Sequence, residues 1–192
     1  MIKKKLMTAF TFLVCIGSGA FSQNFFPENS LSNIETVETI IQNWYGEQLS
    51  ALGEEIIYNR ESELNTIRFT CLRTFDNPFS IRIDWDDQNS DITFRMTDGA
   101  GGYSPGILIR DIAFSITQTE LDNILAVFTR NNFWKLPVNS EDFGLDGSQW
   151  IIEYKTADKY KAVNWWTPEN NAVSEIGNAI IKLSGVEIDN LY

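Results

Sequence analysis

Three arginines, Arg68, Arg82 and Arg95, are the residues best suited to binding chemistry, and each lies in a short stretch that alternates apolar and polar side chains. Guanidinium groups bind carboxylates and phosphates through paired hydrogen bonds. If the three stretches are neighbouring strands, the arginines form a row on the polar face of a sheet and could recognise an anionic ligand. The alternative is that each arginine pairs across strands with an acid such as Asp84.

A glycine-rich segment, residues 98–106, follows the third of these stretches. A phosphate-binding loop needs glycines that open directly into a helix, usually with a lysine. This segment has no lysine nearby and leads into residues 107–109, which have the character of a strand. We therefore expect a hairpin loop. Because long loops often carry function, Gly101, Gly102 and Tyr103 are candidate ligand-binding residues.

Two carboxylates near several tryptophans, Asp146 and Glu153, come closest to a catalytic pair. Glycoside hydrolysis uses two such groups. In an alternating strand, however, Trp150 faces one side and Glu153 the other, where a cross-strand pair with Lys161 is the simpler role. Tryptophans bury large areas in protein cores, and Asp146 begins an Asp-Gly turn. We therefore predict no catalytic residue.

Metal-dependent and histidine-dependent chemistry has little basis in this chain. The acidic stretch 84–91 has oxygen ligands suited to a hard cation but lacks EF-hand spacing, so a solvated turn is expected and no metal site or cofactor is predicted. The chain has no histidine, which removes the commonest general base and metal ligand. Cys71 shares its phase with Phe69 and is expected to be a buried apolar residue.

The N-terminus has the layout of a bacterial secretory signal. Lysines at positions 3–5 precede an apolar run, residues 6–16, and small residues follow. The apolar run is too short to span a bilayer comfortably. Cleavage is expected after Ala20 or, preferably, after Ser22. The signal peptide is thus residues 1–22, and the protein is expected in the periplasm or outside the cell.

Charge restricts the partners. The chain carries 15 basic and 26 acidic residues, a net charge of −11, and loss of the three signal lysines brings it to −14. Such a surface repels phosphate backbones and anionic lipids. We therefore expect neither nucleic acid nor membrane insertion after signal cleavage, and the partner is expected to be an unidentified protein or small ligand.

Residues 23–192 are predicted to form one domain. Capping boxes or a helix-starting proline, with three- to four-residue apolar spacing, predict helices that begin near Ser32, Thr117 and Thr167. Period-two alternation predicts strands with one buried and one wet face, as in antiparallel sheets. These strands centre on residues 67–71, 79–83, 92–96, 112–116, 150–154 and 160–166. The fold class is therefore α+β, with an antiparallel sheet of about six strands covered by about three helices in the order α-ββββ-α-ββ-α.

The C-terminal half carries a pattern of aromatic, glycine and acidic residues. It reads Phe133-Trp134-x-Leu136-Pro137, Gly144-x-Asp146-Gly147-x-x-Trp150-x-x-Glu153, Tyr160 and Trp166-x-Pro168. Over residues 103–185 the chain resembles a family of uncharacterised secreted bacterial proteins. The resemblance implies export and a shared fold, and it assigns no activity and no catalytic residue.

The well-patterned fold without a recognisable catalytic set indicates a non-enzymatic exported domain. We expect it to bind a protein or small ligand through the arginine row or the glycine-rich loop. Two alternatives stay open. One is a carboxylate-based carbohydrate-active enzyme that uses Glu153 and Asp146, and the other is an acidic inhibitor or immunity-type protein that meets a basic target.

Overall fold

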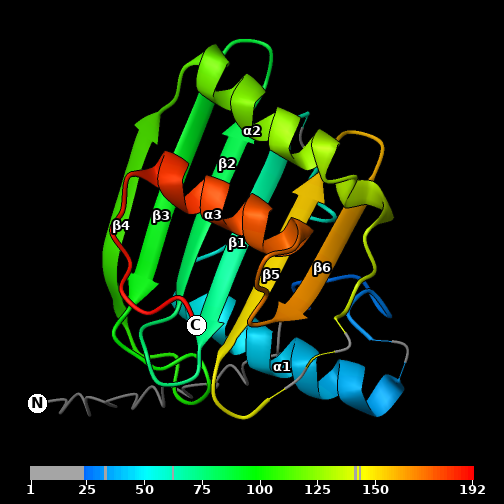
Figure 1. Cartoon of the computed structure of the whole chain (residues 1–192), viewed down its shortest axis with the longest axis vertical. Helices are drawn as coiled ribbons and strands as arrows, with labels where there is room; N and C mark the ends of the chain where they lie inside the picture. The colour runs from blue at the N-terminus through cyan, green and yellow to red at the C-terminus, as the bar shows by residue number, and fades with distance from the viewer. Residues whose placement is uncertain (1–23, 33, 62, 141, 143) are drawn as a thin grey trace, which may run out of the picture.

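The computed structural model describes residues 24–192 except positions 33, 62, 141 and 143 (Figure 1). Helix α1 (Glu35–Ala51) is followed by strands β1 (Asn65–Arg73), β2 (Phe79–Trp85), β3 (Ser90–Thr97) and β4 (Leu108–Ser115). Then come helix α2 (Gln118–Arg130), the 3-10 turn η1 (Phe133–Lys135), strands β5 (Ser148–Lys155) and β6 (Tyr160–Trp166), and helix α3 (Ala172–Ser184). The predicted class and element order are confirmed, while the expected signal peptide lies outside the described residues.

The six strands form one antiparallel sheet in the order β4-β3-β2-β1-β5-β6. Strand β1 is central, since it pairs with β2 on one side and with β5 on the other. The last two strands, β5 and β6, therefore extend the sheet beyond β1, and both halves of the chain share one sheet.

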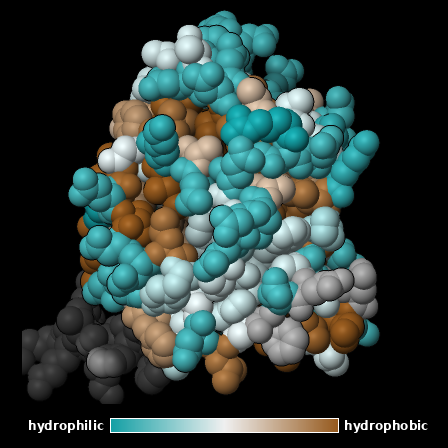
Figure 2. Space-filling view, viewed as in Figure 1, coloured by the Kyte–Doolittle hydropathy of each residue, from teal (hydrophilic) through white to brown (hydrophobic). Residues whose placement is uncertain are grey.

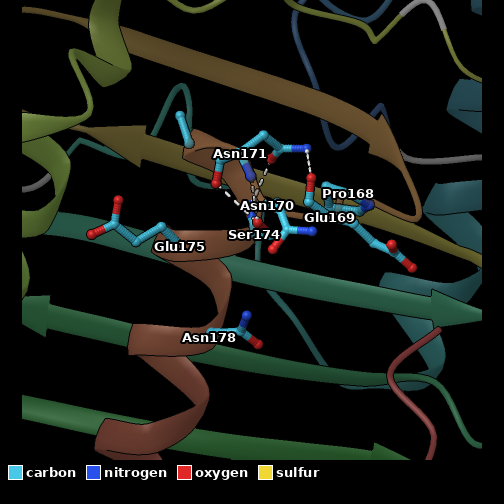
Figure 3. Close-up of a pocket in the computed structure, with 8 residues that line it drawn as sticks. Pro168, Glu169, Asn170, Asn171, Ser174, Glu175 and Asn178 are labelled. Atoms are coloured by element: carbon cyan, nitrogen blue, oxygen red, sulfur yellow. Dashed lines mark hydrogen bonds between the residues drawn. The ribbon is translucent and has the colours of Figure 1, made fainter.

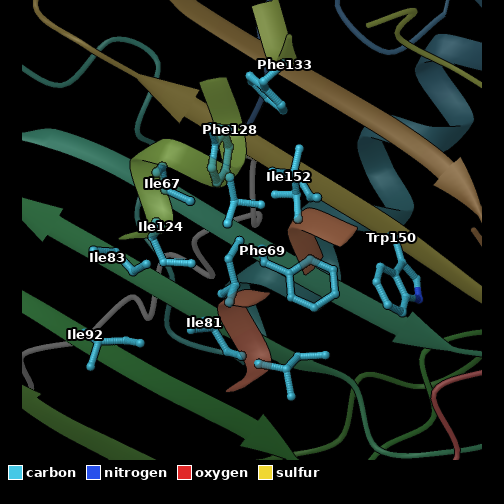
Figure 4. Packing of buried hydrophobic residues seen from close by; sticks show 14 of the residues in the cluster. Ile67, Phe69, Ile81, Ile83, Ile92, Ile124, Phe128, Phe133, Trp150 and Ile152 are labelled. Carbon is cyan, nitrogen blue, oxygen red and sulfur yellow. The ribbon is translucent and has the colours of Figure 1, made fainter. Parts of the chain in front are cut away.

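Helices α2 and α3 lie across one face of the sheet, and α1 lies behind the other (Figure 1). The main core fills the space between the sheet and helices α2 and α3, where Phe69 and Trp150 pack with ring centroids 5.0 Å apart (Figure 4). Gly177 lets α3 approach this pair, because a Cβ there would lie 2.4 Å from the Trp150 ring. Burial of such large rings is a major source of stability.

The opposite face of the sheet is also covered, which the alternating pattern did not predict. A second core on this side contains residues from the N-terminal segment, from α1 and from the sheet: Phe25, Phe26, Leu31, Tyr45, Leu49, Leu72, Ile151 and Ala162. In the connection from α1 to β1 (residues 52–64), Glu54 and Glu55 also lie on this face, where they contact Arg82 and Arg68. Strand β1 is consequently buried at every position after its first residue, so the expectation of one wet face is wrong for this strand and largely wrong for β2 and β5.

The predicted start of the first helix is wrong. Ile34 is the N-cap residue of α1 and supplies no side-chain cap. The Ser32 hydroxyl instead accepts a hydrogen bond from the backbone N–H of Ile34 at 3.1 Å, and because Ser32 lies two residues before the N-cap, no capping box forms. By contrast, the box formed by Thr117 and Glu120 at α2 is confirmed.

The last helix begins later than the Thr167-Pro168 pair predicts. The side chain of Asn171 accepts hydrogen bonds from the N–H groups of Val173 and Ser174, and this cap sets the first helical residue at Ala172. Thr167 has a positive φ of 36°, whereas an N-cap residue normally has an extended backbone with a negative φ. Within the described part of the chain, no helix is long and apolar enough to cross a bilayer.

The two edges of the sheet differ. Residues 136–140 run along β6: the Val138 carbonyl accepts a hydrogen bond from the Asn164 N–H at 2.6 Å, and the Pro137 carbonyl accepts one from the Trp165 indole at 3.1 Å. Strand β4 pairs only with β3 among the described strands, and all of its residues are exposed. An open edge of this kind is one that most proteins protect.

Candidate functional site

The arginine row exists as predicted. Arg68 lies opposite Arg82 in the β1–β2 register, and Arg95 follows on β3, opposite Ser80. All three side chains lie on the α1 side of the sheet. The row is not open to solvent, however, because Arg68 is completely buried and Arg82 is 7% exposed.

The arginines converge on a carboxylate of the same chain. Glu54, in the 52–64 connection, places Oε2 3.0 Å from Arg82 and 3.5 Å from Arg68, and Oε1 3.5 Å from Arg95. The Ser80 hydroxyl donates to Oε1 at 2.8 Å, and the Glu54 side chain is fully buried. Glu54 thus occupies the position in which a carboxylate ligand was expected.

Arg68 has a second carboxylate partner. Its Nε lies 2.6 Å from Oε2 of Glu153 on β5, and the Tyr160 hydroxyl donates to Oε1 of Glu153 at 2.7 Å. Burial raises the pKa of the Glu153 carboxyl above its ordinary value, although Arg68 and Tyr160 act in the opposite direction. Burial also raises the pKa of Tyr160, as does the neighbouring Glu153 carboxylate, so Tyr160 remains a neutral donor. Both Glu153 oxygens are therefore engaged within the protein.

This geometry gives no support to a glycosidase pair. Asp146 is exposed just before β5, whereas Glu153 lies near the other end of that strand and is fully buried. At about 3.3 Å per residue the two carboxylates are separated by roughly 20 Å. A glycosidase needs its two carboxyl groups within about 10 Å, on a shared cleft.

The glycine-rich loop connects β3 to β4, as predicted, and its glycines serve packing. The Gly101 carbonyl accepts hydrogen bonds from the Trp44 indole at 2.8 Å and from the Gln48 amide at 3.3 Å. A Cβ at Gly101 would lie 2.6 Å from the backbone nitrogen of Arg73. Gly102 packs against the backbone in the same way, next to Thr74.

Tyr103 is the predicted loop residue with a large free surface. Its side chain is 65% exposed and stacks on Phe75, itself 59% exposed, with ring centroids 6.0 Å apart. Exposed aromatic pairs are common anchors in protein interfaces. Of the predicted binding residues, the structure therefore leaves Tyr103 best placed to contact a partner.

The acidic turn is held by hydrogen bonds within the protein. Asp84 pairs with Arg82 at 2.7 Å and with Arg60 at 3.1 Å. Asp86 accepts hydrogen bonds from two backbone N–H groups of the turn, which lowers the pKa of its carboxyl. Among the described residues, no group of three acidic or cysteine side chains is placed to hold a metal ion. Cys71 is buried, as predicted.

The glycines of the C-terminal pattern pack against tryptophan. A Cβ at Gly147 would lie 2.7 Å from the Trp166 ring, and one at Gly144 would lie 2.6 Å from its Nε1. The Trp150 indole donates to the Ser148 hydroxyl at 2.8 Å inside the main core. The aromatic and glycine residues of the pattern thus stabilise the fold.

A shallow polar hollow lies at the N-terminus of α3 (Figure 3). Asn170, Asn171, Glu175 and Asn178 line it, and the Asn171 side chain caps the helix. Glu175 pairs with Arg130 on the neighbouring helix. The helix N-terminus favours anions, but the carboxylates of Glu169 and Glu175 beside it oppose that preference.

An exposed apolar surface lies on β4 and the residue before it. Ile107 is 70% exposed, Ile109 is 51% exposed, and Leu108, Ile112 and Phe114 are each 41% exposed. Figure 2 shows apolar surface gathered on this side of the molecule. The alternating pattern predicted Ile112 and Phe114 as core residues, which is wrong because nothing in the described chain covers their outer side.

In comparisons with known proteins, no family model and no curated protein matches this chain.

Proposed function

We propose that the protein is an exported, non-enzymatic domain that binds another protein through the surface formed by β4 and the loop before it. The observation that carries the proposal is the open, apolar edge of β4, whose residues are all exposed. Apolar patches on such edges are typical of protein interaction sites, and an extended partner can add a strand to a free sheet edge.

The contrast between the two edges supports this choice. On the β6 side, residues 136–140 cover the edge, and the Lys161 ammonium donates to the carbonyls of Trp134 and Leu136. Strand β4 itself contains neither proline nor lysine, the residues that commonly protect an edge. One edge is therefore protected within the chain, and the other is left available for a partner.

The aromatic pair at the end of β4 extends the same surface. Tyr103 and Phe75 are exposed and stacked, and Tyr103 lies in the loop that leads into Ile107 and β4. By comparison, the arginine row is neutralised by Glu54 and Glu153 and offers no free guanidinium to a ligand. The glycine-rich loop of the original expectation thus remains part of the proposed surface, while the arginine row becomes structural.

The proposal is tested by photo-crosslinking in the native host. A benzophenone amino acid is placed at position 109, in place of Ile109, and at position 158, in place of the exposed Asp158 of the distant β5–β6 turn, as a control. We expect a covalent adduct from position 109 and none from position 158. Mass spectrometry identifies the captured chain, and its purified form must bind the protein with an affinity that Ile109→Lys lowers at least tenfold. If no adduct forms from position 109, 103 or 114, the proposal is wrong.

A further inference from the structure

We propose that the partner of β4 is a second copy of the same chain, paired with it antiparallel about a two-fold axis at Ile112. This inference rests on the proposed function of the β4 edge. It would double the six-stranded sheet into one continuous sheet across two molecules. The argument comes from the backbone groups that are free, from the phase of the side chains and from the positions of the charges.

The hydrogen bonding of β3 with β4 fixes which backbone groups are free. The Ile116 N–H donates to the Ser90 carbonyl at 2.8 Å, so this pair is a hydrogen-bonded one. Hydrogen-bonded and non-hydrogen-bonded pairs alternate along an antiparallel ladder. The backbone groups of even-numbered residues from Arg110 to Phe114 therefore point towards β3. Those of Asp111, Ala113 and Ser115 point away from the sheet, whereas Ile109 is the extra residue of an irregularity between the Arg110–Met96 and Leu108–Thr97 pairs.

Symmetry limits the possible registers. A two-fold axis perpendicular to the sheet keeps the α2/α3 face of both molecules on one side. Two residues directly opposite each other must therefore have their side chains on the same face of the sheet. The axis then passes through a residue of β4. Two choices give the longest overlap: an axis at Asp111 pairs residues 108–114 with their copies, and an axis at Ile112 pairs residues 109–115.

Charge separates the two registers. An axis at Asp111 places this carboxylate directly opposite its own copy, and like charges in that position destabilise a strand pair. An axis at Ile112 places Asp111 opposite Ala113 and Arg110 opposite Phe114. Every charged side chain of β4 then faces a neutral one, although the whole molecule carries a net negative charge.

The apolar side chains complement each other in the same register. The two Ile112 side chains meet at the axis, in a non-hydrogen-bonded pair where side chains come closest. Arg110 already lies over the Phe94 ring, 4.9 Å from its centroid, and would gain the Phe114 ring of the second copy. About four backbone hydrogen bonds form between Asp111 of each strand and Ala113 of the other. This isologous contact closes on itself and forms no fibre.

The first test is the mass of the purified processed protein by light scattering and sedimentation, from about 1 µM to about 500 µM. We expect a concentration-dependent dimer. Ala113→Pro removes an N–H that points away from β3, so it should leave the fold intact and abolish the dimer. Ile109→Lys should do the same without changing the backbone. A protein that stays monomeric at every concentration overturns the inference.

The second test is cysteine crosslinking, which reads the register. Under mild oxidation Ile112→Cys should form a disulfide-linked dimer, because its two copies meet at a Cα separation of about 4.5 Å. Asp111→Cys should crosslink at least tenfold more slowly, and Asp158→Cys is the control for random collision. The native Cys71 is buried and adds no background. Faster crosslinking of Asp111→Cys than of Ile112→Cys overturns the proposed register.

The two proposals fail differently. A monomeric protein whose position 109 photo-crosslinks to a different, identified protein retains the function proposed for β4 and overturns self-pairing. A protein that neither dimerises nor crosslinks at β4 overturns both.

Discussion

The Arg68 guanidinium and the Glu153 carboxylate face each other across β1 and β5, with 2.6 Å between Nε and Oε2 and neither side chain exposed. One of these residues was a candidate for ligand binding and the other for catalysis. Because they pair with one another, and with Tyr160 and Glu54, both become part of the support of the sheet. Neither side chain is free to bind a ligand, which is why we place the proposed function at the surface of β4.

Removing one member of this buried pair should destabilise the protein strongly. Arg68→Met leaves the Glu153 charge buried without its guanidinium, and we expect the free energy of unfolding to fall by about 3–5 kcal/mol. The double variant Arg68→Met with Glu153→Leu removes both charges and should lose less than the sum of the single variants. Urea unfolding measures these values.

The exposed pair of Arg130 and Glu175 is the matched control for this experiment. Arg130→Met should cost at most about 1 kcal/mol, because exposed ion pairs contribute little. Equal losses for Arg68→Met and Arg130→Met would contradict the structural role of Arg68.

Much of the fold follows from local patterns. The alternation of Ile81 and Ile83 with Arg82 predicts a strand, and the Thr117 box predicts the start of α2, because both depend on neighbours in the sequence. The coverage of Arg68 could not be predicted. It depends on Glu54, which lies in a connection without periodicity, and on β5, which inserts beside β1 from a distant part of the chain.

The exposed surface on β4 could not be predicted from the sequence for a related reason. Ile112 and Phe114 have the same alternation as the core residues of β2, and sequence periodicity cannot tell a central strand from an edge strand. Their exposure follows from the strand order, which places β4 last in the sheet with no helix beyond it. The same alternating pattern thus led to two wrong expectations. The arginine row was expected to be exposed and is buried, and Ile112 and Phe114 were expected to be buried and are exposed.

The stability of the protein should fall at alkaline pH. Burial raises the pKa of the Cys71 thiol from 9.0 to about 12, and burial also raises the pKa values of Tyr45 and Tyr160 above their ordinary value of 10.0. Above pH 9 the folded state therefore keeps protons that the unfolded state loses. The contribution of these buried protonated groups to stability, complete below pH 9, is lost as the pH rises. We expect a slope of about 1.4 kcal/mol per pH unit above pH 9, which steepens above pH 10.

Urea unfolding between pH 8 and pH 10.5 checks this dependence. Cys71→Val removes the thiol and should move the onset of the loss from about pH 9 to about pH 10. The loss above pH 10 should persist in that variant, since it comes from the tyrosines. A free energy of unfolding that stays constant over the whole range would contradict the burial of these groups.

The segment just after the expected signal peptide should be essential for stability. Phe25 is buried in the second core, and the Arg68 guanidinium carbon lies over its ring, 5.9 Å from the ring centroid. Phe25→Ala should lower the free energy of unfolding by about 3–5 kcal/mol. Phe75→Ala, at an exposed phenylalanine, is the control and should change it by less than about 1 kcal/mol.

Processing after Ser22 would leave Phe25 in the mature chain. Mass spectrometry of the exported protein should therefore find Gln23 as its first residue. A mature chain that begins after Phe25 would contradict both the cleavage site and the packing of this segment.

Substitution in the glycine-rich loop should separate packing from ligand binding. A methyl group at Gly101 would lie 2.6 Å from the Arg73 backbone nitrogen, so Gly101→Ala must shift the loop against β1. We expect a loss of more than about 2 kcal/mol. Gly53→Ala is the control, because its φ is +69° with open space around it, and it should cost about 1 kcal/mol. Thermal unfolding compares the two, and a Gly101→Ala protein as stable as the native one would contradict the packing role.

Removal of Glu54 should turn the arginine row into an anion site. Glu54→Ala leaves Arg68, Arg82 and Arg95 around a space that a carboxylate occupied, and we expect a loss of stability of about 3–5 kcal/mol. A small carboxylate such as acetate can enter that space and bind only the folded state. Acetate should therefore restore about 1.4 kcal/mol at a concentration ten times its dissociation constant, whereas chloride at equal ionic strength should not. Glu55→Ala, whose carboxylate is exposed beside Arg60, should show no such rescue. Equal effects of acetate and chloride on Glu54→Ala would show that Glu153 and Asp84 alone neutralise the row.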